Sequence, residues 1–522
     1  MSGSAEILRR ARRRAELLRP RYRAAGYWSA EPFDAVRSAA ERHPGRFAVR
    51  VRGADLTYAE LDARIDATGQ AMLDAGVVPD SPIVLVVGND ADSVVAVHAA
   101  LRIDAVVLLV PRSAGPAQVA EIISGTGIRY GSAPNWPIAG NGLSDRCRWI
   151  EVGDGESAAV PRLRPARAAD EPCLVLYTSG TTSRPKGVIH SLGTLAKASA
   201  NYAAAAGLTG DDCIFLISPL ASVTGVVQAL FVAPMLAVPV VLEDRFNPAS
   251  TCDLLLSSGA TWYGGPDRLL DRVLDEVVAR GAAVPLRAVY LGGTMLDRGI
   301  VARIEDDFGV VVMRAYGSSE VPVSTSGLRD EPRAVRHLDD GVTLDGVELR
   351  IGSAAEPTEC CIRGPHAFLG YTDADGDATG LDGEWFRTGD VAELRQGRVR
   401  IVGRIKDIVI RNGMKIPAGE VENAVARIDG VRQCAAYPVD DPVTGERLAV
   451  AVVADVAAEI SLDGVAAALV SQGLPKYKLP EELVLWDEPL PVNANGKIER
   501  NKLDAAASGR TRLVADRISA NP

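Results

Sequence analysis

Residues 177–188 read YTSGTTSRPKGV and directly follow the apolar residues 174–176. The segment combines hydroxyl donors, glycines that relax the backbone and a mobile positive charge, carried by Thr178, Ser179, Gly180, Thr181, Thr182, Lys186 and Gly187. Such a loop can surround a phosphate group. It is not a P-loop, because that motif ends in Gly-Lys-Ser/Thr and Lys186 stands between Pro185 and Gly187. An ordinary polar turn is the alternative, and the rest of the sequence decides between the two.

Helical stretches alternate with short apolar, β-branched runs on both sides of this loop. A helical stretch at 58–75 is accompanied by runs at 83–87, 105–110, 173–177, 213–218, 238–242, 288–291 and 310–313. This alternation is typical of βαβ units. It predicts an α/β fold in which residues 31–403 form a large N-terminal domain with parallel or mixed sheets.

The pattern differs in four segments of the chain. Between about 340 and 403 short strands with Gly and Asp turns replace the helices, which predicts a β subdomain. Residues 404–505 alternate helix and strand patterns again, so we expect a small, mobile C-terminal α/β domain there. The basic residues 1–30 predict a solvated helix, and the tail 506–522 is expected to be poorly ordered.

The composition restricts the kind of partner. A chain of 522 residues is too long for one ordinary core, and a net charge of −10 argues against a nucleic acid or an anionic membrane as partner. The seven cysteines show no CxxC spacing, and no apolar run reaches the roughly twenty residues of a membrane span. We therefore expect reduced thiols, a cytoplasmic location and a small-molecule partner.

Two segments behind predicted strands carry groups suited to a nucleotide. MRAYGSSEVP at 313–322 places Tyr316 and Glu320 at the carboxyl end of a strand, where open α/β sheets bind ligands. The ring of Tyr316 offers a flat face to a nucleobase, and the carboxylate of Glu320 offers a hard oxygen to magnesium. LGGTML at 291–296 also follows a strand, and its paired glycines permit close approach of the backbone to a flat ligand.

Three further segments offer charged side chains. WFRTGD at 385–390 ends in Asp390, whose carboxylate can accept hydrogen bonds from both hydroxyls of a ribose. GRIKD at 403–407 contains Arg404, which can reach a ribose or phosphate, and Lys406, at which the chain can pivot. NGKIER at 495–500 presents Lys497 from a flexible turn. Each segment alone is also compatible with a solvated surface turn.

In this order the motifs resemble those of the acyl-adenylate-forming superfamily, which includes acyl- and aryl-CoA ligases, nonribosomal adenylation domains and luciferases. The resemblance covers about residues 30–505. RAYGSSEVP, IRGPHAFLGY and GRIKDIVIRNG are most similar to bacterial ligases for medium-chain, cyclic or aryl carboxylates. The resemblance implies ATP, magnesium and CoA as cofactors. It further implies two half-reactions, in which a carboxylate attacks the α-phosphorus of ATP and pyrophosphate leaves, and the CoA thiol then attacks the acyl carbon and releases AMP.

The resemblance also implies roles for the motif residues. Those expected to bind ATP are Thr178, Ser179, Gly180, Thr181, Thr182 and Lys186 at the phosphates, Gly292, Gly293, Thr294, Tyr316, Gly317, Ser318 and Ser319 around the adenine, Glu320 at magnesium, and Asp390 and Arg404 at the ribose. Lys497 is expected to bridge the carboxylate and the α-phosphate. Lys406 is the expected hinge about which the small domain rotates, which brings the loop near Gly413 in for the thiol step.

Two positions depart from the family pattern. Ser183 stands where the family's phosphate loop usually has glycine, and Ser222 stands where many ligases carry a histidine or an aromatic residue. A serine at the second position favours a larger pocket for a bulky or cyclic acid, and altered thiol delivery is the alternative. The predicted pocket is lined by Ser222, Val223, Thr224, Gly225, Tyr263, Gly264, Gly265, Gly292, Ser318 and Val321. The segment 218–225 has no Asp to pair with an α-amino group, which disfavours an amino acid.

These residues leave alternative functions open. The leading hypothesis is an acyl-CoA ligase acting on a bulky, cyclic or aryl acid in secondary metabolism, with a homodimer as a candidate assembly. The enzyme could also stop at the adenylate or pass it to the phosphopantetheine of a carrier protein. A hypothesis of a different class is a nucleotide-binding or thiol-step-only homologue with little adenylation.

Overall fold

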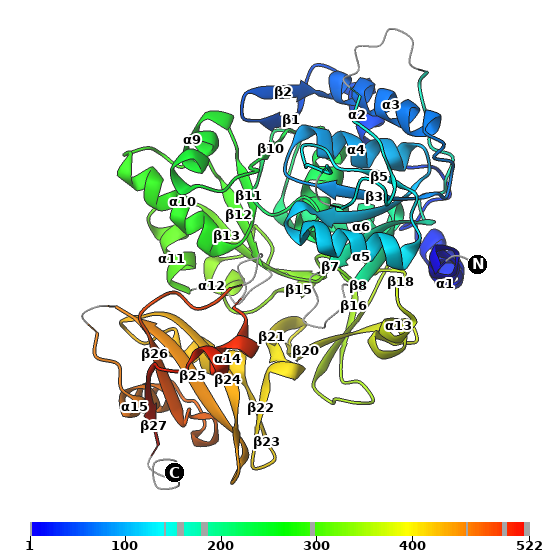
Figure 1. Cartoon of the computed structure of the whole chain (residues 1–522). Coiled ribbons are helices and arrows are strands. Elements are labelled where there is room, and N and C mark those ends of the chain that lie inside the picture. Colours follow the sequence, from blue (N-terminus) through cyan, green and yellow to red (C-terminus); the bar gives the residue numbers. More distant parts are fainter. Residues whose placement is uncertain are drawn as a thin grey trace. The chain divides into compact units, whose positions relative to one another are not determined.

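The computed structural model describes residues 3–139, 142–153, 161–178, 186–292, 298–455, 458–492 and 498–515. The chain divides into two compact units (Figure 1). Unit 1 comprises Met1–Gly293, Ile300–Leu349 and Ile362–Phe386. Unit 2 comprises Thr294–Gly299, Arg350–Cys361 and Arg387–Pro522. All seven cysteines are free thiols.

The first sheet of unit 1 is mostly parallel. Its strands run in the spatial order β15 (Val342–Thr343), β14 (Thr325–Ser326), β13 (Val311–Tyr316), β12 (Ala288–Gly292), β11 (Trp262–Gly265), β9 (Ile214–Leu216), β10 (Val240–Leu242), β1 (Phe47–Val51) and β2 (Ala54–Thr57). From β13 to β1 neighbouring strands are parallel, whereas β2 and β14 join antiparallel. Strand β13 extends beyond the predicted run 310–313, so Tyr316 is its last residue.

The second sheet of unit 1 contains the strands on either side of the opening loop. Its order is β18 (Gly370–Tyr371), β8 (Lys186–Ser191), β7 (Pro172–Thr178), β4 (Val106–Pro111), β3 (Pro82–Val87), β5 (Tyr130–Ser132) and β6 (Arg148–Trp149). The strands from β7 to β6 are parallel, and β8 and β18 are antiparallel additions. The chain therefore reverses at the predicted phosphate loop, between β7 and β8.

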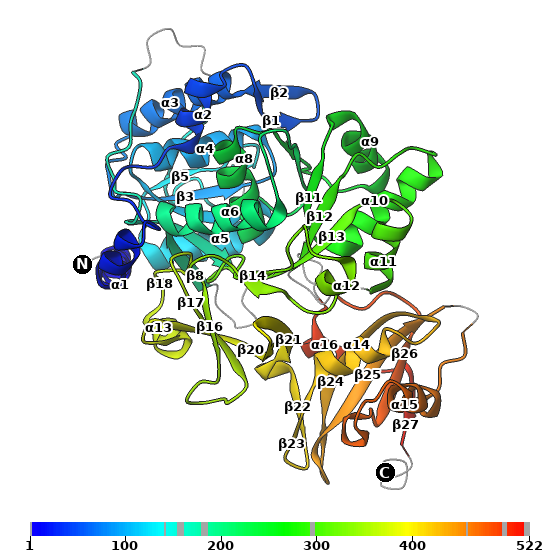
Figure 2. The same cartoon turned by 180° about the vertical axis from the view of Figure 1, so that it is seen from behind.

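Helices connect these strands and cover the sheets. They are α2 (Ala35–Arg42), α3 (Tyr58–Asp74), α4 (Ala91–Arg102), α5 (Gly115–Thr126), α6 (Leu192–Ala206), α7 (Val223–Gly225), the π-helix η2 (Val226–Val232), α8 (Ala233–Leu236), α9 (Pro248–Ser258), α10 (Asp267–Ala279), α11 (Arg298–Asp306), α12 (Arg333–Arg336) and α13 (Ala374–Gly380). Figures 1 and 2 show α9, α10 and α11 together along one side of β11, β12 and β13. Because the helices cover the faces of the sheets, a binding site is expected at the ends of the strands.

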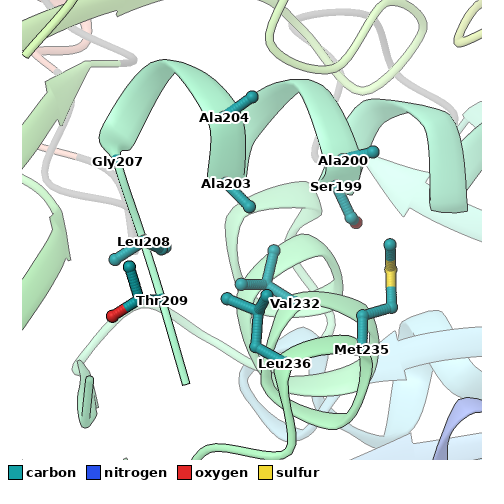
Figure 3. A pocket seen from close by; sticks show the side chains of 10 residues that line it. All are labelled: Ser199, Ala200, Ala203, Ala204, Gly207, Leu208, Thr209, Val232, Met235 and Leu236. Atoms are coloured by element: carbon teal, nitrogen blue, oxygen red, sulfur yellow. The ribbon is translucent and has the colours of Figure 1, made fainter. Parts of the chain in front are cut away.

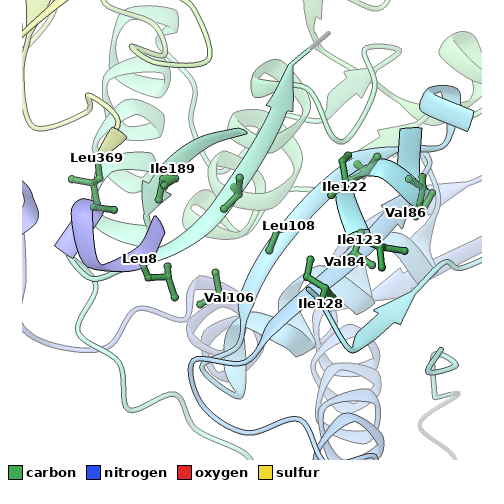
Figure 4. Close-up of a cluster of buried hydrophobic side chains, with 14 of the residues drawn as sticks. Leu8, Val84, Val86, Val106, Leu108, Ile122, Ile123, Ile128, Ile189 and Leu369 are labelled. Atoms are coloured by element: carbon green, nitrogen blue, oxygen red, sulfur yellow. The ribbon is translucent and has the colours of Figure 1, made fainter. Parts of the chain in front are cut away.

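The basic N-terminal segment forms α1 (Gly3–Ala24), and the expectation that it is solvated is wrong. Leu8, Ala11, Ala15, Leu18 and Tyr22 are buried in one cluster with side chains of the second sheet and of α5. Figure 4 shows Leu8 among these residues. The buried positions are three or four residues apart and share one helix face. Burial of this apolar stripe attaches the helix to unit 1, although most of its other residues are charged.

Unit 2 contains a third sheet. Its order is β23 (Met414–Pro417), β22 (Ile408–Arg411), β25 (Gly445–Ala454), β26 (Glu482–Trp486) and β27 (Thr511–Val514), and β24 (Val431–Asp441) also pairs with β25. The helices are α14 (Ala418–Val425), α15 (Leu462–Ser471) and α16 (Arg500–Ala506). The expectation of a poorly ordered tail is wrong for β27, which pairs antiparallel with β26 and packs Leu513 against the core.

Short strands occupy the region expected to be a β subdomain. They are β16 (Glu348–Ile351), β17 (Glu359–Arg363), β19 (Leu381–Asp382), β20 (Trp385–Arg395) and β21 (Arg398–Arg404). The last two form a hairpin in which Asp390 lies opposite Arg404. This hairpin brings together two residues that are fourteen positions apart in the sequence.

Candidate active site

The carboxyl ends of three parallel strands are aligned in the first sheet. Gly265 of β11 is opposite Leu291, and Gly292 of β12 is opposite Ala315, one residue before the end of β13. The glycines are required by the packing itself, because a Cβ at Gly292 would lie 2.9 Å from the carbonyl oxygen of Ala315. The segments predicted to bind adenine and the acyl group therefore lie together at the carboxyl ends of these strands.

The segment after β13 is a tight and strained turn. A Cβ at Gly317 would collide with the backbone nitrogen of Val323, so only glycine fits there. Val323 itself has φ +47°, which is unusual for a β-branched residue. The backbone N–H of Ser324 donates to the carbonyl of Tyr316 at 2.8 Å. Strain of this kind often accompanies functional sites, and here it sets the position of the residues between Tyr316 and Val323.

Glu320 is held at both carboxylate oxygens. The hydroxyl of Tyr371 donates to Oε1 at 2.7 Å, and the hydroxyl of Ser318 donates to Oε2 at 2.7 Å. A carboxylate has about four acceptor positions, so these bonds leave roughly half of them for a cation or its water. Among the described residues no group of three or more His, Cys, Asp and Glu could hold a metal. A single carboxylate with free acceptor positions fits a magnesium ion that also binds phosphate oxygens and water, as this ion prefers.

The hairpin of β7 and β8 carries the opening loop. Thr178 and Lys186 lie opposite each other where the two strands meet the loop. The ammonium of Lys186 lies 5.6 Å from the centroid of the Tyr371 ring, which is within the range of a cation–π contact. Tyr371 thus adjoins both Lys186 and Glu320.

Several predicted residues lie outside the described residues, namely Ser179, Gly180, Thr181, Thr182, Ser183, Gly293, Thr294 and Lys497.

His190 of β8 is a residue near the site that sequence reasoning missed. Its Nε2 lies 2.7 Å from the carbonyl oxygen of Ser319, and its Nδ1 lies 3.0 Å from the hydroxyl of Thr194. Burial lowers the pKa of His190 to about 4. The imidazole is therefore neutral at pH 7 and donates from Nε2 to the carbonyl, which can only accept. A histidine directly after the apolar residues Val188 and Ile189 was the available signal.

Ser222 has a structural role that the sequence did not reveal. Its hydroxyl donates to the carbonyl of Pro219 at 2.6 Å and accepts from the N–H of Gly225 at 3.1 Å, so it caps α7. Gly225 has no room for a side chain against the carbonyl of Pro219. The side chains of Val223 and Thr224 are half-buried. The function predicted for Ser222 in the pocket remains a prediction.

Other predicted pocket residues are more deeply buried. The Tyr263 side chain is fully buried and donates its hydroxyl to the carbonyl of Pro266 at 2.8 Å, and Val321 is also inaccessible. Gln228 of the π-helix η2 lies nearby and was missed by sequence reasoning: a Cβ on Gly264 would lie 2.5 Å from its Oε1. Nε2 of Gln228 donates to the Gly264 carbonyl at 3.0 Å, whereas Oε1 has no hydrogen-bond partner within the described part of the chain.

A separate cavity of about 460 Å³ lies between α6 and the segment formed by η2 and α8 (Figure 3). Its lining is mainly apolar and comprises Ser199, Ala200, Ala203, Ala204, Gly207, Leu208, Thr209, Val232, Met235 and Leu236. None of the predicted acyl-pocket residues lines it. The cavity is therefore distinct from the predicted acid site.

Unit 2 holds the remaining predicted residues. Asp390 is buried and its Oδ1 lies 3.0 Å from Nε of Arg404, whose side chain is about half exposed. Glu359 supports the turn before Asp390 by accepting from the N–H of Gly389 at 3.2 Å. The carboxylate of Asp390 is therefore held in place at the open end of the hairpin, where it can accept hydrogen bonds.

The expected hinge and thiol-step loop also lie in unit 2. Lys406 is part of the short helix η3 (Ile405–Asp407), and Asp407 forms an ion pair with Arg500 of α16 at 3.3 Å. Gly413 follows Asn412 in the two-residue turn between β22 and β23, with φ of +75° and +51° for these residues. Two left-handed residues are typical of a type I′ hairpin turn, which explains the glycine.

Together the fold and the site define a class of protein: an α/β protein with glycines, an aromatic ring and a carboxylate at the carboxyl ends of parallel strands, where nucleotides bind, and with a lysine beside Tyr371. Residues 36–372 match the family model described as AMP-binding enzyme, and residues 420–497 match that of the AMP-binding enzyme C-terminal domain. The chain therefore belongs to the AMP-binding enzymes.

Known relatives support this assignment. The chain is 29% identical to a salicylyl-CoA synthase / salicylate adenylyltransferase of a Streptomyces species, over 95% of this chain and 97% of the relative. It is 28% identical to a salicyl-AMP ligase / salicyl-S-ArCP synthetase of Mycobacterium tuberculosis, over 92% of each. Among solved structures it is similar to O-succinylbenzoate coenzyme A synthetase of Bacillus subtilis with ATP and magnesium, with TM-score 0.78, 22% identity and coverage of 90% of this chain and 99% of that one.

The chain is thus an AMP-forming acid–thiol ligase. It activates a carboxylic acid with ATP as an acyl-adenylate. The predictions of an α/β fold, of this superfamily and of ligase activity are confirmed. A relative named for CoA and a similar structure with ATP and magnesium support the predicted cofactors. No helix within the described ranges is long and apolar enough to cross a membrane.

Proposed function

We propose that the acid is bulky, cyclic or aryl, that it carries no α-amino group, and that CoA is the acceptor. The predicted acyl segment is uncharged and rich in small residues, which favours a wide pocket without an ionic partner for an amine. The unpartnered Oε1 of buried Gln228 beside Gly264 supports an acid with a hydrogen-bond donor, since a buried acceptor is costly to leave unpaired. A ring that carries a hydroxyl or amino substituent would fill a wide pocket and would also offer a hydrogen-bond donor to Gln228.

The observation that carries the proposed adenylation site is the position of Glu320. Its carboxylate lies after β13, keeps acceptor capacity and adjoins Tyr371, which also contacts Lys186. In the proposed site Glu320 holds magnesium, which supplies positive charge to the phosphates. Lys186 and the loop of Thr178, Ser179, Gly180, Thr181 and Thr182 hold the β- and γ-phosphates. Tyr316 stacks on the adenine beside Gly292, Gly293 and Thr294, with Gly317, Ser318 and Ser319 completing the turn.

Unit 2 supplies the remaining proposed roles. Asp390 accepts hydrogen bonds from the ribose hydroxyls and Arg404 assists it, which the supported turn and the ion pair favour. Lys497 bridges the carboxylate and the α-phosphate during adenylation. Rotation about Lys406 then withdraws Lys497 and presents the hairpin turn at Gly413 to the thiol step. We expect Lys497→Ala to abolish adenylation and to spare the thiol step from supplied acyl-adenylate.

A second acceptor follows from Ser222. Its small side chain at the position where many ligases carry a larger residue alters the route of the thiol, and the relative from M. tuberculosis is described as both an AMP ligase and an ArCP synthetase. Transfer to a carrier-protein phosphopantetheine is therefore the second candidate. A homodimer is the assembly we propose for either acceptor.

One experiment tests acid and acceptor together. Pyrophosphate release is measured with linear, cyclic, aryl and polycyclic acids, with and without CoA, and the products are identified by mass. Release with substituted aryl or cyclic acids and appearance of a CoA thioester support the proposal. Accumulation of adenylate without thioester excludes CoA as acceptor, and strict preference for linear acids excludes the proposed substrate class.

A further inference from the structure

We infer that Tyr371 is a positioning residue for Glu320 and that the N-terminal helix α1 supports it through Arg10. This inference rests on the proposed role of Glu320 at magnesium. It assigns a function in adenylation to a tyrosine 51 positions from the carboxylate and to an arginine more than 360 positions from the tyrosine. The contacts that carry it all lie within unit 1.

The first link is the hydrogen bond between Tyr371 and Glu320. The hydroxyl of Tyr371 donates to Oε1 at 2.7 Å. The phenol hydroxyl is the donor in this bond, because a carboxylate oxygen accepts. Because Ser318 donates to Oε2, the two hydroxyls together fix the orientation of the carboxylate plane. A carboxylate fixed in this way offers its remaining lone pairs in one direction.

The second link fixes the tyrosine itself. Tyr371 belongs to β18, where it pairs with Val188 of β8, and its backbone N–H donates to Oδ1 of Asp377 at 2.6 Å. Its ring packs edge-to-face on Phe368 with centroids 4.8 Å apart, and the backbone N–H of Phe368 donates to the Glu320 carbonyl at 2.8 Å. The hydroxyl of Tyr371 is therefore delivered to Glu320 by a rigid segment.

The third link joins this segment to α1. Arg10 donates from Nε to Oδ2 of Asp377 at 3.3 Å, and from Nη2 to the carbonyls of Tyr371 and Thr372 at 3.3 and 3.2 Å. Asp377 thus accepts from Arg10 at one oxygen and from the Tyr371 backbone at the other. One guanidinium satisfies three acceptors around the tyrosine, and the buried stripe of α1 holds that guanidinium in place.

The same segment also reaches the phosphate loop. Thr372 accepts from the N–H of Gly187 at 3.1 Å through its hydroxyl, and its own N–H donates to the Gly187 carbonyl at 2.8 Å. The Tyr371 ring lies under the ammonium of Lys186. Residues 371 and 372 therefore link the base of the loop to Glu320, so that a single support aligns the proposed cation and phosphate sites.

The test is the magnesium dependence of pyrophosphate release in the full-length enzyme. Partners that orient a metal ligand typically contribute about 10- to 100-fold to metal affinity or activity, so we expect Tyr371→Phe to raise the half-saturating magnesium concentration about 10-fold. Arg10→Gln should raise it by a smaller factor, about 3-fold, and Arg10→Lys should restore part of the loss. Transfer of the acyl group from supplied acyl-adenylate to CoA should change less than about 2-fold, because no pyrophosphate leaves in that step.

Two further variants make the outcomes distinct. Tyr437→Phe is the matched control: it also removes a buried hydroxyl, one without a hydrogen-bond partner in the described structure, and it should leave the magnesium dependence unchanged. Glu320→Gln tests the proposed function itself. If Glu320→Gln weakens the response to magnesium and Tyr371→Phe does not, the positioning role is wrong. If neither variant changes it, the assignment of Glu320 is wrong. Equal losses in both half-reactions of Tyr371→Phe would mean a merely structural tyrosine.

Discussion

The two proposed nucleotide-contacting carboxylates are held in different ways. Glu320 of unit 1 accepts hydrogen bonds from two neutral hydroxyls, and the backbone next to it is fixed by the strained turn and by His190. Asp390 of unit 2 forms an ion pair with the half-exposed Arg404 at the open end of a hairpin. The carboxylate of Glu320 is therefore held in one orientation, which suits the near-octahedral coordination of magnesium. The carboxylate of Asp390 is paired with an arginine side chain that can move when the ribose hydroxyls bind.

The largest expected effect is at the first carboxylate. Glu320→Gln keeps the shape of the side chain and removes its charge, so acid-dependent pyrophosphate release should fall about 100- to 1,000-fold, as for loss of one preorganised electrostatic group. The measurement is the initial rate at saturating ATP and magnesium. Glu276→Gln, which removes an exposed carboxylate paired with Arg280, is the control and should be neutral. A fall of less than 3-fold in Glu320→Gln would remove Glu320 from the site.

The next effect concerns the buried histidine behind the same turn. The pKa of His190 is lowered to about 4 by burial, whereas an unfolded histidine titrates near 6.5. Below pH 6.5 the unfolded chain binds the proton and the folded chain does not, so stability decreases as pH falls from 6.5 to 4. The expected loss is about 3 kcal/mol from this residue.

Urea unfolding at pH 7.0, 5.5 and 4.5 measures this loss. His190→Gln removes the titrating group, so its stability should depend less steeply on pH than that of the wild type. His366, also fully buried and with its pKa lowered to about 3, remains in both proteins and contributes equally to each. Identical pH dependences would show that His190 is not buried in its neutral form.

The second carboxylate should give a smaller effect. Asp390→Asn keeps an acceptor but removes the charge that strengthens bonds to the ribose hydroxyls, so KM for ATP should rise about 10-fold with a smaller change in kcat. Its control is Asp455→Asn, which breaks an exposed ion pair with Arg432 in the same unit. Because Arg404 is half exposed, added salt should affect the wild type more than Asp390→Asn. An equal salt response in both would exclude a functional ion pair.

The smallest expected effect separates the two interpretations of Ser222. Ser222→Ala removes the cap of α7 and should lower the free energy of unfolding by about 1 kcal/mol. Ser461→Ala removes a cap of the same geometry on α15 and serves as the comparison. Ser222→His should in addition narrow the accepted acids toward slimmer ones. An unchanged acid profile in that variant would leave Ser222 with its capping role alone.

Local sequence patterns predicted much of the fold. The alternation of apolar runs and helical stretches identified strands and helices because burial imposes a period on each element. The site could be predicted where its residues stand next to each other, as in the turn from Tyr316 to Glu320. Asp390 and Arg404 lie in separate motifs, yet both motifs are recognisable, so that pairing was also within reach.

The supports of the site were not predictable in this way. Tyr371 contacts Glu320, Arg10 contacts Asp377, and His190 contacts Ser319 only because segments distant in the chain become neighbours in the fold. The burial of α1 was misjudged because its charges outnumber the apolar stripe that attaches it. The predicted role of Ser222 likewise took no account of a helix of three residues, which has no periodicity of its own.

Exchange of labelled pyrophosphate into ATP tests the central claim most directly, because it reports reversible adenylation without any thiol. The account predicts exchange that requires both magnesium and a substituted aryl or cyclic acid, and that falls at least about 100-fold in Glu320→Gln. Exchange that proceeds without an acid, or equally well in Glu320→Gln, would contradict a carboxylate-activating site built around this residue.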